Sequence, residues 1–254
     1  MLDWWQFPWL FLAGLAAGFV DSIAGGGGMI TLPVLLSLGM DPQQALGTNK
    51  LQASFGSGGA TWHYARAGTV DLRECGRGFV LTFMGAAAGA LAVQQVDPLF
   101  LKRAIPALLL AVGIYLFVKP GLGDKDLHPR MNRTGFEFLF GLGLGFYDGF
   151  FGPGTGTFWA MAYVLGLGFN LTSATSHTKV MNFASNISSL FFFLLGGKVL
   201  FVAGLLMGAG QLAGARLGSG MVISRGTKFI RPVFLTVVFA ITIQLLWKGW
   251  NNSR

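Results

Sequence analysis

The chain has 254 residues, of which 53% are hydrophobic and only 11% are charged, and its formal net charge is +8. Soluble domains carry about 25% charged residues, so the composition excludes an ordinary soluble domain. The positive charge does not indicate a nucleic-acid partner, because lysine and arginine crowd the short loops, as in membrane proteins, and form no basic helix face. The single cysteine, Cys75, excludes an internal disulfide and a cysteine metal cluster.

Long stretches without Asp, Glu, Lys or Arg recur along the chain. They lie at 4–20, 22–40, 78–96, 180–197 and 199–215. A helix needs about 17–25 apolar residues to cross the hydrocarbon core. Several such stretches predict an all-α, polytopic transmembrane bundle, because backbone polar groups in lipid must be satisfied within helices.

The chain also repeats itself. Residues 14–27, GLAAGFVDSIAGGG, align with 141–154, GLGLGFYDGFFGPG, and later matches keep the same order. A repeat of this length indicates two copies of one structural unit. We therefore expect transmembrane repeat 1 at residues 1–118, a connecting loop at 119–133 and transmembrane repeat 2 at 134–254.

Each repeat is expected to hold five helical segments. They are predicted at 7–24, 28–39, 42–66, 74–95 and 98–118, and again at 134–151, 155–168, 171–196, 199–221 and 225–248. The second segment of each repeat follows a run of glycines and reaches only about 18 Å, against a hydrocarbon core of about 30 Å. Paired broken helices are typical of transporter binding sites and favour inverted repeats, although lysine and arginine counts are equal for inverted and parallel arrangements.

Glycine pairs spaced four residues apart occupy equivalent places in the fourth segments. They are Gly85 and Gly89 in the first repeat, and Gly210 and Gly214 in the second. Small residues on one helix face allow another helix to pack closely, so we interpret these pairs as packing positions.

Two lysines lie where a charge is costly in a membrane. Lys50 and Lys179 occupy equivalent places near the start of a long helix, and each precedes a long stretch without formal charge. An intramembrane lysine marks a functional site by default, so the pair predicts a cationic site. The alternative is that each lysine snorkels to the interface or pairs with Asp21 or Asp148.

Small polar residues accompany both lysines, and glycine runs precede the short second segments. A polar stripe suits the oxygens of an anion, although Ser, Thr and Asn also bond between membrane helices. The glycine runs free helix N-termini, whose N–H groups and dipole attract anions. The predicted substrate-binding residues are Lys50, Lys179, Asn49, Thr178, Gly27, Gly28, Gly154, Thr155, Gln52, Asn182, Asn186 and Ser57.

Two aspartates and one histidine are candidates for ion coupling or a structural ion pair. Asp21 and Asp148 end the first helix of each repeat, and they would pair with the lysines, bond freed N–H groups or exchange protons; pairing and bonding are favoured. His177 replaces Thr48 in the second repeat. A proton-linked switch is one interpretation, because the reference pKa of histidine is about 6.5, and a structural role is the favoured one.

The motifs around these residues resemble a known family. GFVDSIAGGGG at 18–28, GTNKLQ at 47–52, GFYDGFFGPG at 145–154 and the Thr178–Lys179 pair are similar to the TauE/SafE family of sulfite and organosulfonate exporters, and in particular to its YfcA-like branch. The resemblance implies a multi-pass transporter of the bacterial inner membrane for sulfite, sulfoacetate or related anions. It does not identify the substrate, because the YfcA-like branch is generally without an assigned one.

The leading hypothesis is secondary transport of a small anion, in the export direction, by alternating access, with no enzymatic activity, cofactor or metal. A passive anion channel is one alternative. An intramembrane aspartyl protease that uses Asp21 and Asp148 is another, although the Gly-x-Gly-Asp element of that class is missing. The expected partners are the anion and membrane lipid, and the broad lipid face would allow a homodimer.

Overall fold

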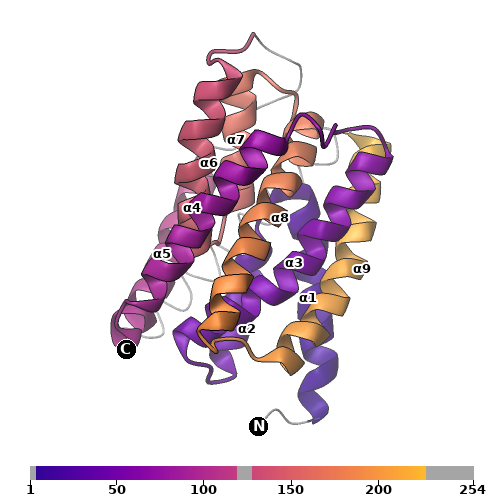
Figure 1. Ribbon diagram of the computed structural model, residues 1–254. Helices are drawn as coiled ribbons and strands as arrows, with labels where there is room; N and C mark the ends of the chain where they lie inside the picture. The colour runs from indigo at the N-terminus through magenta and orange to yellow at the C-terminus, as the bar shows by residue number, and fades with distance from the viewer. Residues whose placement is uncertain (1–3, 119–127, 227–254) are drawn as a thin grey trace.

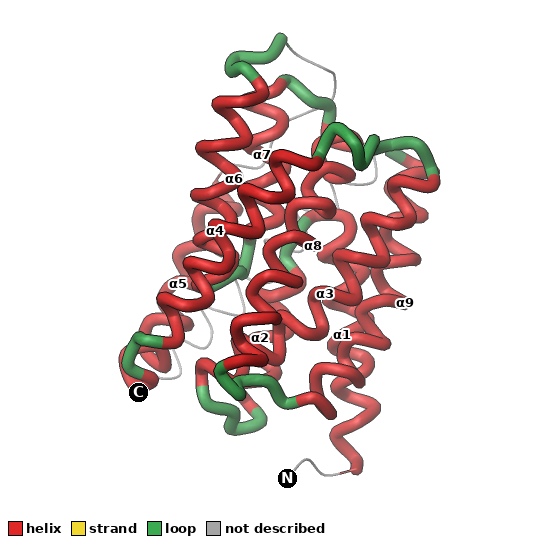
Figure 2. The backbone as a smooth tube through the Cα atoms, viewed as in Figure 1, coloured by secondary structure: helices red, strands yellow, loops and turns green. Residues whose placement is uncertain are grey.

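The computed structural model describes residues 4–118 and 128–226, and every regular element in these ranges is a helix (Figures 1 and 2). The elements are the 3-10 helix η1 (Trp4–Gln6) and the α-helices α1 (Phe7–Ala24), α2 (Gly27–Ser37), α3 (Pro42–Arg66), α4 (Gly76–Gln94), α5 (Pro98–Val118), α6 (Arg133–Phe150), α7 (Thr155–Leu167), α8 (Leu171–Leu195) and α9 (Phe201–Arg225). The predicted all-α class is confirmed for these ranges.

The predicted segments agree closely with the helices. The first eight predicted segments begin and end within a few residues of α1 to α8. The ninth was predicted to end at residue 221, whereas α9 ends at Arg225. The next residue, Gly226, is the C-cap and has a positive φ of 60°. The predicted tenth segment, 225–248, lies almost wholly outside the described residues.

The first helix of each repeat packs against the fourth helix of the other repeat. In the α1–α9 pair, a Cβ added to Gly210 or Gly214 would overlap the backbone carbonyl oxygen of Phe11 or Leu15. In the α4–α6 pair, a Cβ at Gly85 would overlap the carbonyl oxygen of Leu142 in the same way. The glycine pairs are therefore close-packing positions, as predicted, because only glycine lets two helix backbones approach so closely.

The third helices, α3 and α8, pack side by side and run in opposite directions. At one end, the N–H of Leu200, just after α8, donates to Thr48 Oγ1 near the start of α3 at 2.9 Å. At the other end, Ser176 Oγ near the start of α8 donates to Thr69 Oγ1, just after α3, at 3.0 Å. Figure 1 shows the same arrangement, with α1, α3 and α9 rising and α4, α6 and α8 descending.

The two short helices begin where the glycine runs interrupt the chain. The chain turns at Gly25, with a φ of 70°, before α2, and at Gly152 and Gly154, with φ values of 96° and 80°, before α7. The two breaks touch, because Thr157 Oγ1 donates to the carbonyl oxygen of Gly25 at 2.8 Å. A Cβ at Gly25 would lie 2.5 Å from the Cα of Gly156, so the contact requires glycine.

The described part of the chain buries many polar side chains within an apolar core and exposes large apolar side chains on its surface. Two lysines and many amide and hydroxyl side chains are buried, including Gln43, Gln52 and Gln211. Large apolar side chains are exposed instead, for example Trp9 at 66% and Leu195 at 71%. By length and apolarity alone, Trp4–Ala24 and Gly76–Gln94 qualify as membrane spans among the described helices. An apolar exterior on this scale is what contact with lipid requires.

Candidate functional site

Two buried ion pairs connect the repeats. Lys50 Nζ on α3 lies 2.7 Å from Asp148 Oδ1 on α6. Lys179 Nζ on α8 lies 3.0 Å from Asp21 Oδ2 on α1. Each lysine therefore pairs with the aspartate of the other repeat. Both lysines are almost completely buried, and a buried charge of this kind needs a partner to offset its lost hydration.

The carboxylate of Asp148 is held from two sides. Besides the ion pair, Lys50 Nζ donates to the backbone carbonyl oxygen of Asp148. Ser185 Oγ on α8 donates to the second carboxylate oxygen, Asp148 Oδ2. The side chain of Asp148 is only 6% exposed, so this pair is almost completely buried.

The carboxylate of Asp21 is held more loosely. Its second oxygen, Oδ1, accepts a hydrogen bond of 3.3 Å from the backbone N–H of Gly27, the first residue of α2. No other side chain among the described residues donates to it besides Lys179. The side chain of Asp21 is 17% exposed, about three times the exposure of Asp148.

A small cavity lies between the two glycine breaks and has a volume of about 30 Å³. Its walls combine both aspartates, glycines of both breaks and amide side chains from three helices. The lining residues are Asp21, Gly25, Gly26, Gly27, Gly28, Asn49, Ala53, Asp148, Gly152, Gly154, Thr155, Gly156, Asn182, Asn186 and Gln211. This volume holds about one or two water molecules, so the structure has the cavity in a form too small for an organosulfonate.

The N-termini of α2 and α7 both face this cavity. Neither N-cap residue, Gly26 or Gly154, has a side chain that could cap the helix. The first N–H groups of a helix lack partners within the helix, and the helix dipole places partial positive charge there. The cavity therefore receives positive potential from two helix ends, while the two lysines beside it are neutralised by aspartates.

Most predicted site residues meet at this cavity. Asn49, Gly27, Gly28, Gly154, Thr155, Asn182 and Asn186 line it, together with both aspartates. Ser57 and Gln52 lie behind it, because Asn186 Nδ2 donates to Ser57 Oγ at 3.4 Å and Gln52 Nε2 donates to Asn49 Oδ1 at 2.8 Å. Lys50 and Lys179 do not line the cavity. Their aspartate partners do, so the charge of each lysine is neutralised beside the cavity wall.

Two predicted residues lie away from the cavity walls. The structure places His177 among aromatic rings, with Nδ1 2.8 Å from the carbonyl oxygen of Ser173 and the ring beside Tyr163 and Phe169. It does not reach either ion pair. Thr178 is buried, and its hydroxyl has no hydrogen-bond partner. The structural role of His177, which the sequence favoured, stays a prediction.

Gln211 on α9 is the residue that the sequence did not predict. It lines the cavity, is 1% exposed, and its Oε1 has no hydrogen-bond partner. Gly56 on α3 makes room for it, because a Cβ there would overlap Gln211 Cγ. The repeat alignment places Ala86 opposite Gln211, so a glutamine where the other repeat has alanine was the available signal. Asn182 Oδ1 also has no partner. Buried polar atoms of this kind call for a water or ligand.

The arrangement of the aspartates does not favour the protease hypothesis. A catalytic pair shares a proton between two adjacent carboxyl groups. Asp21 and Asp148 instead face different lysines, and each accepts further hydrogen bonds from separate groups.

Comparison with known proteins identifies the family. The family model described as "Sulfite exporter TauE/SafE" matches residues 10–245. The chain belongs to the TauE/SafE family. The resemblance seen in the sequence motifs is thus confirmed, and with it the assignment as a transmembrane transporter protein. No solved structure matches this TauE/SafE chain.

Several relatives cover nearly the whole TauE/SafE chain. A "Probable membrane transporter protein" of Haemophilus influenzae is 46% identical over 242 residues, which is 95% of each chain. The "Probable membrane transporter protein YfcA" of Escherichia coli is 45% identical over 244 residues, or 96% of this chain and 91% of the relative. The "Probable membrane transporter protein ORF9" of Sinorhizobium sp. is 47% identical over 237 residues, or 93% and 91%.

Proposed function

We propose that this protein is a secondary transporter that exports a small anion, such as sulfite, sulfoacetate or a related organosulfonate, across the bacterial inner membrane. One observation carries the proposal: two helix N-termini with glycine N-caps and several buried amides converge on one cavity between the repeats. Helix N-termini bind oxyanions through N–H groups and the dipole, and amide side chains supply further donors. The family name, which specifies sulfite export, supports the same class of substrate.

We further propose that the repeats have inverted topology and that transport proceeds by alternating access. The opposite course of α3 and α8, which are equivalent helices, supports inversion. The reciprocal packing of α1 with α9 and α6 with α4 supports it as well. Broken helices at the interface of inverted repeats recur in secondary transporters, where one unit rocks against the other about a fixed site.

The ion pairs suggest how charge is handled during the cycle. In the form with the small cavity, both lysines are neutralised by aspartates. An arriving anion therefore meets the helix N-termini and the amide side chains first. Separation of the Lys179–Asp21 pair, whose carboxylate is the more exposed of the two, would release Lys179 to the anion.

The test is counterflow of labelled sulfite and sulfoacetate in proteoliposomes that contain the purified protein. A carrier accumulates label against unlabelled anion on the other side, whereas a passive channel lets the label equilibrate only. Replacing Gln211 by Met should reduce counterflow at least about tenfold, because the loss of one hydrogen bond to a charged ligand costs about 1.5–3 kcal/mol. The exposed Gln95→Met serves as the matched control. Absence of any flux or binding for every sulfur oxyanion would overturn the proposed substrate class.

A further inference from the structure

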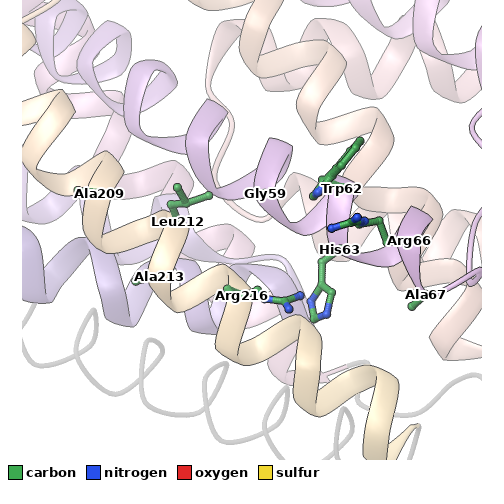
Figure 3. A pocket seen from close by; sticks show the side chains of 9 residues that line it. All are labelled: Gly59, Trp62, His63, Arg66, Ala67, Ala209, Leu212, Ala213 and Arg216. Atoms are coloured by element: carbon green, nitrogen blue, oxygen red, sulfur yellow. The ribbon is translucent and has the colours of Figure 1, made fainter.

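A second, larger cavity opens between the outer faces of α3 and α9, close to the end of α3 (Figure 3). Its volume is about 790 Å³, and it shares no lining residue with the central cavity. The residues that line this groove are Gly59, Trp62, His63, Arg66, Ala67, Ala209, Leu212, Ala213 and Arg216.

Two arginines in this groove have no carboxylate partner in the part of the chain that the structure describes. Neither Arg66 nor Arg216 forms an ion pair with a described residue, and both are exposed. The guanidinium of Arg66 lies over the ring of Trp62, 5.3 Å from its centroid. Arg216 is the only charged residue of α9 before Arg225. An arginine on a membrane helix is costly without a counter-charge, so this pair calls for an anion from outside the chain.

The neighbouring histidine is held in place beside Arg216. His63 Nδ1 lies 2.6 Å from Ser219 Oγ on α9, which joins the two helices at the floor of the groove. Figure 3 shows the imidazole of His63 and the guanidinium of Arg216 close together, with Arg66 and Trp62 on the same side. The groove thus presents polar donors from two helices to one space.

The equivalent face of the other repeat lacks this chemistry. The repeat alignment places Phe191, Phe192 and Leu195 opposite Trp62, His63 and Arg66, and Leu91 opposite Arg216. Phe191, Leu195 and Leu91 are exposed and apolar, so the fold itself does not need a basic groove at this position. The basic residues therefore serve something specific to the α3–α9 side.

The surroundings of the groove indicate lipid. Exposed apolar side chains run along α9 on both sides of it, at Leu205, Leu212 and Leu217. Arg66 is the last residue of α3, Arg73 lies in the loop that follows, and Arg77 lies at the start of α4. Basic pockets between membrane helices at the positively charged side bind anionic headgroups, and acyl chains can lie along the adjoining apolar surface.

We propose that this groove binds an anionic phospholipid, with Arg66 and Arg216 as ligands of the headgroup phosphate and Trp62 as the interfacial anchor. Two guanidinium groups can contact phosphate oxygens with charge-assisted hydrogen bonds. The volume accommodates a headgroup, and the exposed leucines extend the site along the acyl chains. The proposal does not depend on which anion the central cavity transports.

The experiment measures lipid retention by native mass spectrometry and melting temperature, on the purified full chain in detergent. Phosphatidylglycerol should be retained and should raise the melting temperature, because a ligand of the folded form stabilises it. Phosphatidylcholine should do neither. Glycerol phosphate, the free headgroup, should give at most a small shift, and an equal shift would show a soluble phosphate site and overturn the lipid assignment.

Two variants and one control locate the site. The double variant Arg66→Gln and Arg216→Gln should weaken retention of phosphatidylglycerol at least about tenfold, since each basic residue contributes about 1 kcal/mol at a charged lipid surface. Lys102→Gln with Arg103→Gln removes the same charge from the exposed surface of α5 and should retain the lipid. Unchanged retention in the arginine variant would overturn the proposal.

A third variant covers the case in which loss of the arginines prevents folding. Ala213→Phe keeps every charge but fills the groove from an exposed position on α9. It should abolish selective retention of phosphatidylglycerol and leave the melting temperature in phosphatidylcholine unchanged. Normal retention in this variant would place the lipid elsewhere and would contradict the proposal.

Discussion

The Lys50–Asp148 pair and the Lys179–Asp21 pair occupy equivalent places in the two repeats, but their surroundings differ. Asp148 also accepts a hydrogen bond from Ser185, whereas the position equivalent to Ser185 in the first repeat is Gly56. Gly56 leaves Asp21 without a serine partner and admits the side chain of Gln211 instead. The repeats have thus kept the ion pairs and changed the residues around them.

This difference assigns separate roles to the two halves of the site. The Lys50–Asp148 pair is almost fully enclosed and is suited to hold the repeats together. The Lys179–Asp21 pair is more exposed and lies beside Gln211 and Asn182. The side-chain amide oxygens of these two residues have no hydrogen-bond partners among the described residues. We therefore propose that the second pair is the half that an arriving ligand rearranges.

The largest expected effect comes from removing each lysine in turn. Lys50→Ala leaves the buried carboxylate of Asp148 without its cation and should destabilise the fold by about 3–5 kcal/mol. Lys179→Ala should cost less, because Asp21 keeps the N–H of Gly27 and more contact with its surroundings. Thermal unfolding in detergent measures both. The double variant Lys50→Ala and Asp148→Ala should be more stable than Lys50→Ala alone. Equal losses of stability in Lys50→Ala and Lys179→Ala would contradict the difference between the two ion pairs.

The next effect concerns the two glycine breaks. Gly25→Ala combines a positive φ with a backbone overlap against Gly156, and it should separate the breaks and abolish transport. Gly152→Ala should instead disturb the enclosed ion pair, because the new Cβ would lie 2.9 Å from Asp148 Oδ1. Flux in proteoliposomes measures the effect of Gly25→Ala, and the melting temperature measures the effect of Gly152→Ala.

Gly26 provides the matched control for both substitutions. It belongs to the same break, but its φ of −161° suits any residue, and the nearest atom to an added Cβ is 3.9 Å away. Because Gly26 also lines the cavity, Gly26→Ala is a control for stability alone and should keep the melting temperature. A Gly25→Ala protein with normal flux would show that the contact between the breaks is dispensable.

A smaller effect is expected from the serine that distinguishes the two pairs. Ser185→Ala removes a hydrogen bond to a charged group and should cost about 1.5–3 kcal/mol of stability. Ser189→Ala, one turn later, removes a bond of 2.7 Å to the neutral carbonyl oxygen of Ser185 and should cost about 0.5–1.5 kcal/mol. If the two variants melt at the same temperature, Ser185 does not stabilise the enclosed pair.

The smallest effect concerns the reactivity of Cys75, which precedes α4. Burial raises the pKa of the Cys75 thiol to about 11, so the reactive thiolate is scarce at neutral pH and increases only as the pH rises toward that value. Cys75 should therefore label slowly with maleimide near pH 7 and faster near pH 10. Rapid labelling of the unaltered protein at pH 7 would contradict this expectation.

Because Cys75 should label slowly near pH 7, the labelling of cysteines introduced at equivalent positions of the two repeats can be compared. Asn49→Cys lies at the cavity wall, whereas Thr178→Cys, its equivalent, does not. Substrate should protect the cysteine at position 49 and leave the cysteine at 178 unaffected. Equal protection at both positions would indicate that the two halves contribute alike.

The sequence by itself determined the helical segments and the two breaks, and it predicted the two repeats. These features depend on local physics: apolar length, glycine where a helix must stop, and the internal match of GFVDSIAGGG with GFYDGFFGPG. It also singled out Lys50, Lys179, Asp21 and Asp148, because a charge within an apolar stretch is costly wherever the helix lies.

Only the tertiary structure decided which of these residues meet. The exchange of partners between repeats follows from the packing of α1 on α9 and α6 on α4, and no property of a single helix specifies that choice. The same packing brings Gln211 to the cavity, leaves His177 among aromatic rings and neutralises both lysines. The ion pairs depend on contacts between residues 98 and 158 positions apart. Small glycines let some helices approach, and larger side chains keep others apart.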